Sequence, residues 1–286
     1  MKKLKQIFNE VKTNSHTPDE LNQLLWQLIC YSPKMPVRLQ QQQLLDEAEK
    51  FILKAKDEYF AHRDLSFNGF KWGSGKYKVL ITHGWGSKAA DFAEMIIALR
   101  EIDDLEIIAF DAPGNGSSEG ELSNLLLFIE AVKAIISNFG SPDILIGHSL
   151  GGMANVIAIR ETKIKPSLLI SFTPLIRLKE NFEATMSAAD VSRSAQDEFF
   201  KSFEAHFGKH ADHYNLHDLY DFDGKHWLAY DQQDIISTYT FIEQFLNANP
   251  LIESHNYDGI GHEKMIKSPE VIGDVVSLVK ELIQRV

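Results

Sequence analysis

The sequence has little cysteine and no excess of positive charge. Cys30 is the single cysteine among 286 residues, which excludes an intrachain disulfide framework and a zinc site of the Cys-x-x-Cys type. The formal net charge is −11. Binding to nucleic acid or to an anionic membrane surface demands clustered Lys and Arg, so this charge argues against both. We therefore expect no nucleic-acid partner.

Long apolar runs are also missing. The basic residues Lys2, Lys3 and Lys5 are not followed by an apolar stretch of signal-peptide length, and no stretch is long enough to span a bilayer. A single cysteine suits a reducing compartment. Hydrophobic residues make up 44% and charged residues 24% of the chain, which is the balance of a soluble globular protein. These features predict a cytoplasmic protein without a membrane span.

From Lys78 onward, apolar runs of strand character alternate with segments of helical period. The predicted strands are 79–82, 106–110, 144–146, 168–172 and 227–230. One predicted helix carries a stripe of Leu122, Leu125, Leu126, Ile129 and Val132, and the last begins at Pro269 after Ser268 as N-cap. This alternation predicts an α/β fold, with a mostly parallel central sheet flanked by helices on both faces.

Two regions depart from the alternation. Residues 175–223 lie between two predicted core strands and far exceed a usual connection of about 2–6 residues, so we expect an inserted helical cap. Residues 1–50 are helical in pattern, and Thr17 to Glu20 form a capping box before the second helix. A strand pair is expected near 51–70. The N-terminal helices could dock on the core, cover an active-site edge or dimerise, and the sequence leaves these three open.

A nucleophile elbow is indicated by Gly147-His148-Ser149-Leu150-Gly151, a Gly-x-Ser-x-Gly run between a predicted strand and a predicted helix. A serine at positive φ on such a turn needs neighbours without bulk, which the glycines supply. The alternative to a nucleophile elbow is that so short a pattern occurs by chance.

A second glycine-rich loop, His83-Gly84-Trp85-Gly86-Ser87, follows the strand 79–82 directly. It therefore lies at the carboxyl edge of the sheet, where open α/β folds bind ligands. Tight chain reversal alone would also explain its glycines.

A catalytic serine needs a base and an acid that orients this base. His262 lies on the loop Gly259-Ile260-Gly261-His262-Glu263 just before the last helix, where an imidazole can reach the serine. His255, its nearest rival, sits in an alternating run and is expected to be a solvated strand residue. Asp231 and Asp234 both follow the strand 227–230. Asp234 lies further into the loop and is favoured as the acid, which leaves Asp231 to shape the loop.

Five segments in this order resemble the α/β-hydrolase superfamily, and within it a group of largely uncharacterised bacterial hydrolases. They are His83-Gly84-Trp85-Gly86, 110–117 (Phe-Asp-Ala-Pro-Gly-Asn-Gly-Ser), 147–152 (Gly-His-Ser-Leu-Gly-Gly), Asp231-x-x-Asp234 and Gly259-Ile260-Gly261-His262. The resemblance covers roughly residues 60–286. It implies an α/β-hydrolase domain at 51–286, with the cap inserted at about 175–223 and a helical extension at 1–50.

The resemblance also implies a catalytic triad of Ser149, Asp234 and His262, no cofactor, and cleavage of an ester or related acyl bond of a small-molecule substrate. By the same logic, the backbone N–H groups of Trp85 and Leu150 form the oxyanion hole. Two departures matter. Asn115 stands where such proteins often carry His and could alter the pocket mouth, and Asp231 stands where many have Gly.

The cap carries a second candidate cluster. His206, His210, His213 and His217 are spaced four, three and four residues apart, which would place them on one helical face and could hold a metal. Gly208 weakens a continuous helix there, so a solvated face is the preferred interpretation and no metal site is predicted. The aromatic residues of the same segment have helical spacing and should pack on the core, or line an acyl pocket: Phe199, Phe200, Phe203 and Phe207.

Three function classes follow. The first is a serine hydrolase acting through an acyl-enzyme on Ser149. The second is an enzyme of the same fold with other chemistry, such as a thioesterase, peptidase, carbon–carbon hydrolase or lyase, because the fold does not fix the leaving group. The third is a non-catalytic binding protein. The presence of a serine, an acid and a histidine in this order along the chain argues against it. The acyl-chain preference and the oligomeric state stay open.

Overall fold

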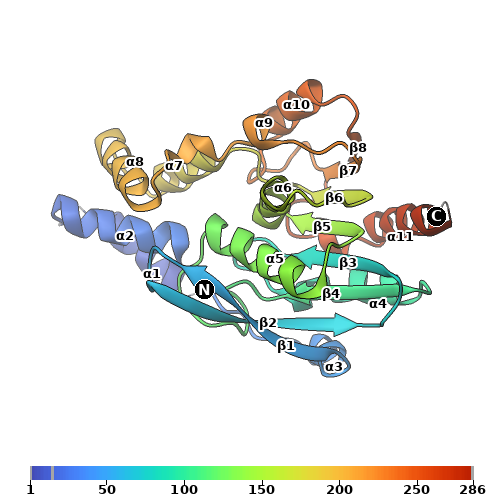
Figure 1. The fold of residues 1–286 in the computed structure, drawn as a ribbon. Coiled ribbons are helices and arrows are strands. Elements are labelled where there is room, and N and C mark those ends of the chain that lie inside the picture. Colours follow the sequence, from blue (N-terminus) through green and yellow to red (C-terminus); the bar gives the residue numbers. More distant parts are fainter. Residues whose placement is uncertain (1, 14–15, 285–286) are drawn as a thin grey trace.

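The computed structural model describes residues 2–13 and 16–284, and its centre is an eight-stranded sheet (Figure 1). The strand order is β1-β2-β4-β3-β5-β6-β7-β8. The pairs β1–β2 and β2–β4 are antiparallel, and the remaining pairs are parallel. The strands are β1 (Glu49–Asp57), β2 (Arg63–Trp72), β3 (Tyr77–Thr82), β4 (Leu105–Phe110), β5 (Ile144–His148), β6 (Leu168–Phe172), β7 (Lys225–Tyr230) and β8 (Glu253–Asn256).

Helices cover both faces of this sheet, which confirms the predicted α/β fold. The helices α5 (Leu125–Phe139), α6 (Leu150–Thr162) and α10 (Tyr239–Ala248) pack on one face, and α4 (Ala93–Arg100) and α11 (Pro269–Gln284) pack on the other. Alternate residues of a strand point into the two apolar clusters, one on each face of the sheet. Leu80 of β3 joins the first, whereas its neighbours Val79 and Ile81 join the second. The five predicted core strands agree with the observed ones to within two residues at each end.

The start of α5 differs from the expectation. Asn124 caps this helix by accepting a hydrogen bond from the Leu127 N–H, so the helix begins at Leu125. Leu122, which was placed on the helical stripe, lies before the cap and forms an isolated β-bridge with Tyr31. That part of the prediction is wrong, because the cap and this long-range bridge decide the local conformation.

The N-terminal residues form α1 (Lys2–Val11), α2 (Pro18–Cys30) and α3 (Leu39–Asp46). The predicted capping box is present, since Thr17 accepts from the Glu20 N–H while the Glu20 carboxylate accepts from the Thr17 N–H. No helix within the described ranges is long and apolar enough to cross a membrane.

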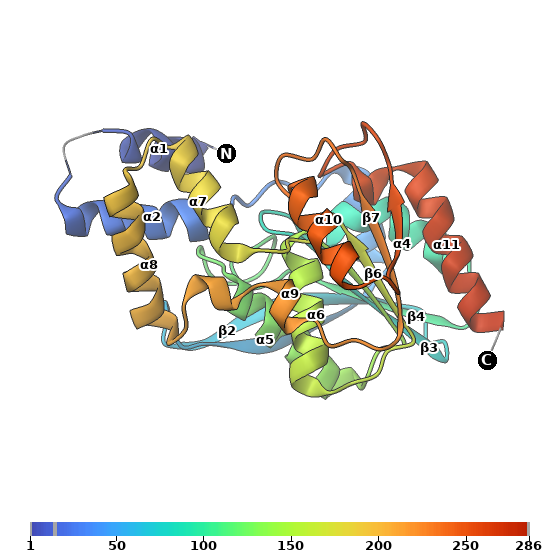
Figure 2. The ribbon, with the colours of Figure 1, turned by 90° about the horizontal axis from the view of Figure 1, so that it is seen from above.

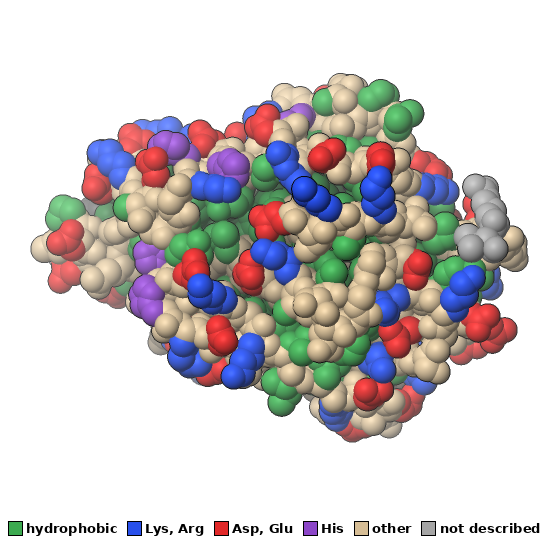
Figure 3. Space-filling model, in the orientation of Figure 1, with side chains coloured by type: hydrophobic (Ala, Val, Ile, Leu, Met, Phe, Trp, Pro, Cys, Tyr) green, Lys and Arg blue, Asp and Glu red, His purple; other side chains and the backbone are tan. Residues whose placement is uncertain are grey.

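Between β6 and β7, residues 175–223 form α7 (Leu178–Ala188), α8 (Arg193–Phe207), the short 3₁₀ helix η2 (Ala211–His213) and α9 (Leu216–Leu219). The helices α7 and α8 share a third apolar cluster with α1 and α2, and Figure 2 shows these four helices grouped at one side of the sheet. Hydrophobic side chains are also visible where this group faces α5 and α6 (Figure 3). The division into extension, hydrolase domain and cap stays a prediction.

Candidate active site

Ser149 lies on the turn between β5 and α6 with φ 51° and ψ −119°. Positive φ is uncommon for a residue with a side chain and marks local strain. The flanking glycines are required by packing. A Cβ on Gly151 would lie 2.3 Å from the His83 carbonyl oxygen, and one on Gly147 would lie 2.7 Å from the Gly152 Cα. The structure therefore has the sharp strand-to-helix turn that the motif predicts.

The loop after β3 lies against this turn. A Cβ on Gly84 would lie 3.2 Å from the Ser149 Cβ, so the backbone passes directly beside the serine. The next residue, Trp85, has a side chain that is 36% exposed. The amide N–H of Leu150 is at the first position of α6, where helices leave N–H groups without a partner inside the helix. The two proposed oxyanion donors are thus carried by segments that meet at Ser149.

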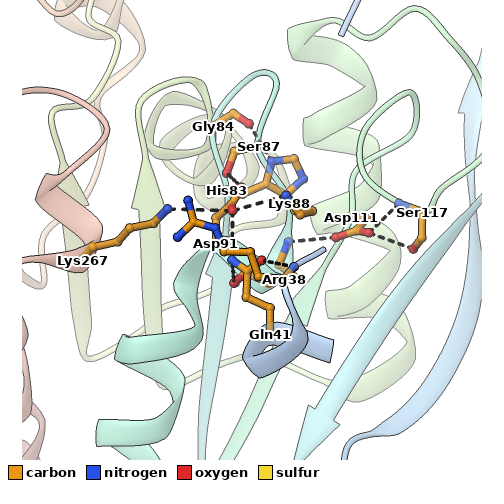
Figure 4. A network of polar contacts seen from close by, with 12 residues as sticks. Arg38, Gln41, His83, Gly84, Ser87, Lys88, Asp91, Asp111, Ser117 and Lys267 are labelled. Carbon is orange, nitrogen blue, oxygen red and sulfur yellow. Dashed lines mark hydrogen bonds and ion pairs between the residues drawn. The ribbon is translucent and has the colours of Figure 1, made fainter. Parts of the chain in front are cut away.

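The His83 side chain fixes the peptide bond that carries the Trp85 N–H (Figure 4). Its Nε2 accepts a hydrogen bond from the Ala112 N–H at 2.9 Å, so the proton of the neutral ring is on Nδ1. Nδ1 donates it to the Gly84 carbonyl oxygen at 2.6 Å. Because the C=O and N–H of a trans peptide point in opposite directions, holding the Gly84 oxygen also orients the Trp85 N–H. Burial lowers the pKa of His83, which keeps the ring neutral.

Two carboxylates brace this loop from behind (Figure 4). Asp91 accepts from the Ser87 hydroxyl at 2.8 Å and pairs with Lys88 at 3.3 Å and Lys267 at 3.9 Å. Burial alone would raise the pKa of Asp91, but Lys88, Ser87 and Lys267 outweigh it and lower that pKa. Asp111 accepts from the Ala89 N–H at 2.8 Å and the Ser117 N–H at 2.7 Å. The loop is therefore held by contacts with both carboxylates.

The predicted acid and base are in contact. His262 Nδ1 lies 2.6 Å from Asp234 Oδ2, and their side chains are 10% and 1% exposed. The other carboxylate oxygen, Oδ1, accepts from the N–H groups of Ile236 at 2.7 Å and Ser237 at 3.1 Å. Asp234 is thus fixed by its own loop and presents its second oxygen to the imidazole.

Asp231 has a different set of contacts. Its Oδ2 accepts from the Gly261 N–H at 2.7 Å, and its Oδ1 accepts from the Gln233 N–H at 2.9 Å. These bonds tie the loop after β7 to the loop that carries His262. The geometry thus associates Asp234 with the imidazole and Asp231 with the loop backbone.

His148 joins the base to the elbow, which the sequence analysis did not anticipate. Its Nε2 donates to the His262 carbonyl oxygen at 3.1 Å, and the two ring centroids are 4.7 Å apart. His148 Nδ1 has no hydrogen-bond partner within the described part of the chain. Burial, and then the charge of His262, lowers the pKa of His148 to about 3. His262 is therefore held against His148, the residue that precedes Ser149.

His255, the rival base, lies exposed on β8, and its ring stacks on Tyr257 with the centroids 4.9 Å apart. This is the solvated strand position that the sequence predicts.

The four histidines of the inserted segment do not share one helical face, so that prediction is wrong. The helix α8 ends at Phe207 and Gly208 adopts φ 68°, which turns the chain before His210. His213 lies in η2 and His217 in α9. Lys209 Nζ is 3.0 Å from His213 Nε2. The lysine ammonium thus occupies the side of the ring where a metal ion would need the lone pair of this nitrogen. Over residues 2–13 and 16–284, no group of three His, Cys, Asp or Glu could hold a metal ion.

A model of the alpha/beta hydrolase family matches residues 79–266, which is more than half of the chain. The chain belongs to the alpha/beta hydrolase family. This confirms the resemblance to the α/β-hydrolase superfamily.

Relatives match over a shorter part. A stretch of 122 residues is 29% identical to monoglyceride lipase of Rattus norvegicus and covers 40% of this chain and 40% of that protein. Monoglyceride lipase of Homo sapiens is 28% identical over 112 residues, 36% of this chain and 37% of that protein. The chain therefore matches less than half the length of these curated relatives.

Solved structures resemble a larger part of the chain. An esterase of Pyrococcus furiosus has a TM-score of 0.61 with 17% identity, over 90% of this chain and 98% of that one. Mouse alpha/beta hydrolase domain-containing protein 10 has a TM-score of 0.64 with 19% identity, over 83% of this chain and 99% of that one. At these identities the likeness concerns the fold alone.

Proposed function

We propose that this alpha/beta hydrolase is a serine hydrolase that cleaves a carboxylic ester or a related acyl bond. The observation that carries the proposal is the Asp234–His262 contact of 2.6 Å, with His262 held against His148, the neighbour of Ser149 on its positive-φ turn. A serine hydroxyl is a weak nucleophile unless an oriented base removes its proton. Asp234 holds His262 in one tautomer and stabilises the imidazolium that forms when His262 takes the proton.

The chemistry runs in two acyl-transfer steps. Ser149 Oγ attacks the substrate carbonyl while His262 takes its proton, and the oxyanion that forms is held by the N–H groups of Trp85 and Leu150. His262 then protonates the leaving alcohol, which departs and leaves an acyl-enzyme on Ser149. Water, deprotonated by His262, attacks this ester, and His262 returns the proton to Ser149 Oγ as the acid leaves. The start of α6 adds the positive end of its dipole at the developing charge.

The proposed substrate is a small acyl ester. The named activity of the partial relatives, monoglyceride lipase, supports starting from esters of glycerol. A panel of p-nitrophenyl esters of different chain length, monoacylglycerols, acyl-CoA and aminoacyl compounds separates an esterase from a thioesterase or a peptidase.

The decisive experiment is labelling with a fluorophosphonate probe, which acylation-competent serines attack. We expect the protein to be labelled and Ser149→Ala to lose both the label and the turnover of any ester. The variant should keep its fold, because Ser149 is only half-buried and the loss of one Oγ atom leaves no large cavity in the core. A Ser149→Ala protein that still turns over esters would end the proposal.

A further inference from the structure

Asn115 forms a fully buried junction between three segments of the chain. Its Oδ1 accepts from the Ser32 hydroxyl at 2.5 Å and from the Gly86 N–H at 3.1 Å. Its Nδ2 donates to the Pro113 carbonyl oxygen at 3.2 Å and to the Ser123 hydroxyl at 2.9 Å. All hydrogen-bonding groups of the amide are used, so Asn115 does not face a pocket mouth as the sequence suggested.

The segment 31–34, between α2 and α3, is fastened along this junction. The Ser32 N–H donates to the Glu121 carbonyl oxygen at 3.4 Å, and the Ser123 N–H donates to the Cys30 carbonyl oxygen at 2.7 Å. Lys34 Nζ donates to the Ser118 carbonyl oxygen at 2.5 Å. The Ser32 side chain is 1% exposed. The middle of this segment, Ser32 and Pro33, is therefore buried beside the glycine loop.

Gly84 and Gly86 are the two neighbours of Trp85, and each has its own anchor. The Gly84 carbonyl oxygen is held by His83, and the Gly86 N–H is held by Asn115. Between them, the Trp85 side chain is 36% exposed and packing holds it only in part. Gly86 also adopts φ 72°, a conformation that glycine reaches as readily as negative φ. The orientation of the Trp85 N–H thus depends on polar contacts at both ends.

We infer that Asn115 and Ser32 are positioning residues for the oxyanion hole, and that the N-terminal part of the chain supports the active site through Ser32 alone. The inference rests on the proposed serine-hydrolase function. Asn115 fixes the second anchor of the loop, and Ser32 fixes Asn115. The helices before β1 then act on catalysis through one buried hydrogen-bond chain, without touching the substrate.

The kinetic test uses Asn115→Ala and Ser32→Ala in the full chain. An oxyanion forms only in the transition state, so kcat should fall while KM stays near the wild-type value. Removal of a direct oxyanion donor costs about 10²–10³ in kcat, and loss of an indirect anchor should cost less. We expect a loss of about 10-fold to 100-fold for Asn115→Ala and about three- to tenfold for Ser32→Ala.

A structural role alone would not change how tightly the enzyme binds a transition-state analogue. Affinity for a trifluoromethyl ketone, which forms a tetrahedral oxyanion with serine, should fall in proportion to kcat in both variants. Affinity for the matched methyl ketone should stay unchanged. Lys34→Met is the control, because it removes another bond of the same segment without touching Asn115 or Gly86 and should keep wild-type kcat.

Hydrogen exchange gives a readout that does not need activity. The peptide covering 83–89 should exchange faster in Ser32→Ala than in wild type or in Lys34→Met. If the variants fold and keep wild-type kcat, analogue affinity and exchange, the inference is overturned. Labelling by the fluorophosphonate probe would still support the serine-hydrolase function in that case. If wild type is not labelled, the proposed function fails, and unchanged exchange in Ser32→Ala would then refute the positioning role as well.

Discussion

Asp234 Oδ2 and His262 Nδ1 lie 2.6 Å apart although 28 positions separate the two residues. The same carboxylate receives the N–H groups of Ile236 and Ser237 on its other oxygen. These backbone contacts therefore orient the carboxylate independently of the imidazole. A second acid, Asp231, is in the same loop but binds the Gly261 N–H. The two carboxylates thus have separable tasks.

This separation predicts unequal effects of two matched substitutions. Asp234→Asn places an amide against His262 Nδ1, which favours the wrong tautomer, and should lower kcat by about 10⁴ as the equivalent change does in serine-protease triads. Asp231→Asn keeps an oxygen for the Gly261 N–H and should cost less than tenfold. Steady-state kinetics on one p-nitrophenyl ester measures both. The reverse ranking would assign the orienting role to Asp231.

The hydrogen bonds of the His83 ring predict unequal effects of two further substitutions, His83→Asn and His83→Gln. An asparagine amide nitrogen can take the place of Nδ1 and still donate to the Gly84 oxygen, whereas a glutamine reaches the Nε2 position and loses that bond. We therefore expect kcat of His83→Gln to fall at least about tenfold below that of His83→Asn. Unfolding in urea should show both variants folded. Equal kcat values would mean that Ser87, whose N–H also donates to the Gly84 oxygen at 3.2 Å, holds the peptide unaided.

The parts of the site that could be predicted are those encoded locally. The turn at Ser149 needs small neighbours, and Gly147 and Gly151 stand beside it in the sequence. The strands that precede Ser149 and Asp234 contain continuous apolar runs, because these parallel strands are buried on both faces. The loop positions of Ser149 and Asp234 follow from these runs, whereas β8, the strand before His262, is polar and exposed.

The supporting contacts could not be predicted, because they join residues far apart in sequence. The hydrogen bond from Ser32 to Asn115 spans 83 positions, and the one from His148 to the His262 carbonyl spans 114. No periodicity encodes such pairs. The failed histidine face has a local cause instead. Gly208 ends α8 in the left-handed conformation, so spacing beyond it no longer describes a helix.

Buried neutral histidines predict a loss of stability in acid. Burial lowers the pKa of His226 to about 3, as it does for His148, whereas histidine in an unfolded chain titrates near 6.5. As the pH falls below about 6.5, the unfolded chain binds protons that the folded chain refuses. The free energy of unfolding should then fall by about 1.4 kcal/mol per pH unit for each such histidine, down to about pH 3.

Substitution of one imidazole isolates its share of this slope. His226 is enclosed between Tyr220 and the Ser171 hydroxyl, and His226→Gln keeps polar groups there without a titrating ring. Its free energy of unfolding, measured in urea between pH 6 and pH 4, should depend on pH less steeply than in wild type by about 1.4 kcal/mol per unit. His255→Gln, which alters an exposed ring on the adjacent strand, should keep the wild-type slope. Identical slopes for all three proteins would contradict the assignment.

The contacts of Trp26 with α8 predict how much the packing of α2 on the inserted segment contributes to the stability of the protein. Its ring lies 4.8 Å from Phe199 and 5.7 Å from Phe207 of α8, centroid to centroid, and its Nε1 donates to the Ser202 hydroxyl at 3.1 Å. Trp26→Ala removes an aromatic side chain from this contact and should lower the free energy of unfolding by about 3 kcal/mol. Trp26→Phe keeps a ring and loses mainly the hydrogen bond, so it should cost only about 1 kcal/mol. Urea unfolding measures both. If Trp26→Ala were as stable as Trp26→Phe, the aromatic contacts would contribute nothing, and α2 would be held to α8 by its other buried residues.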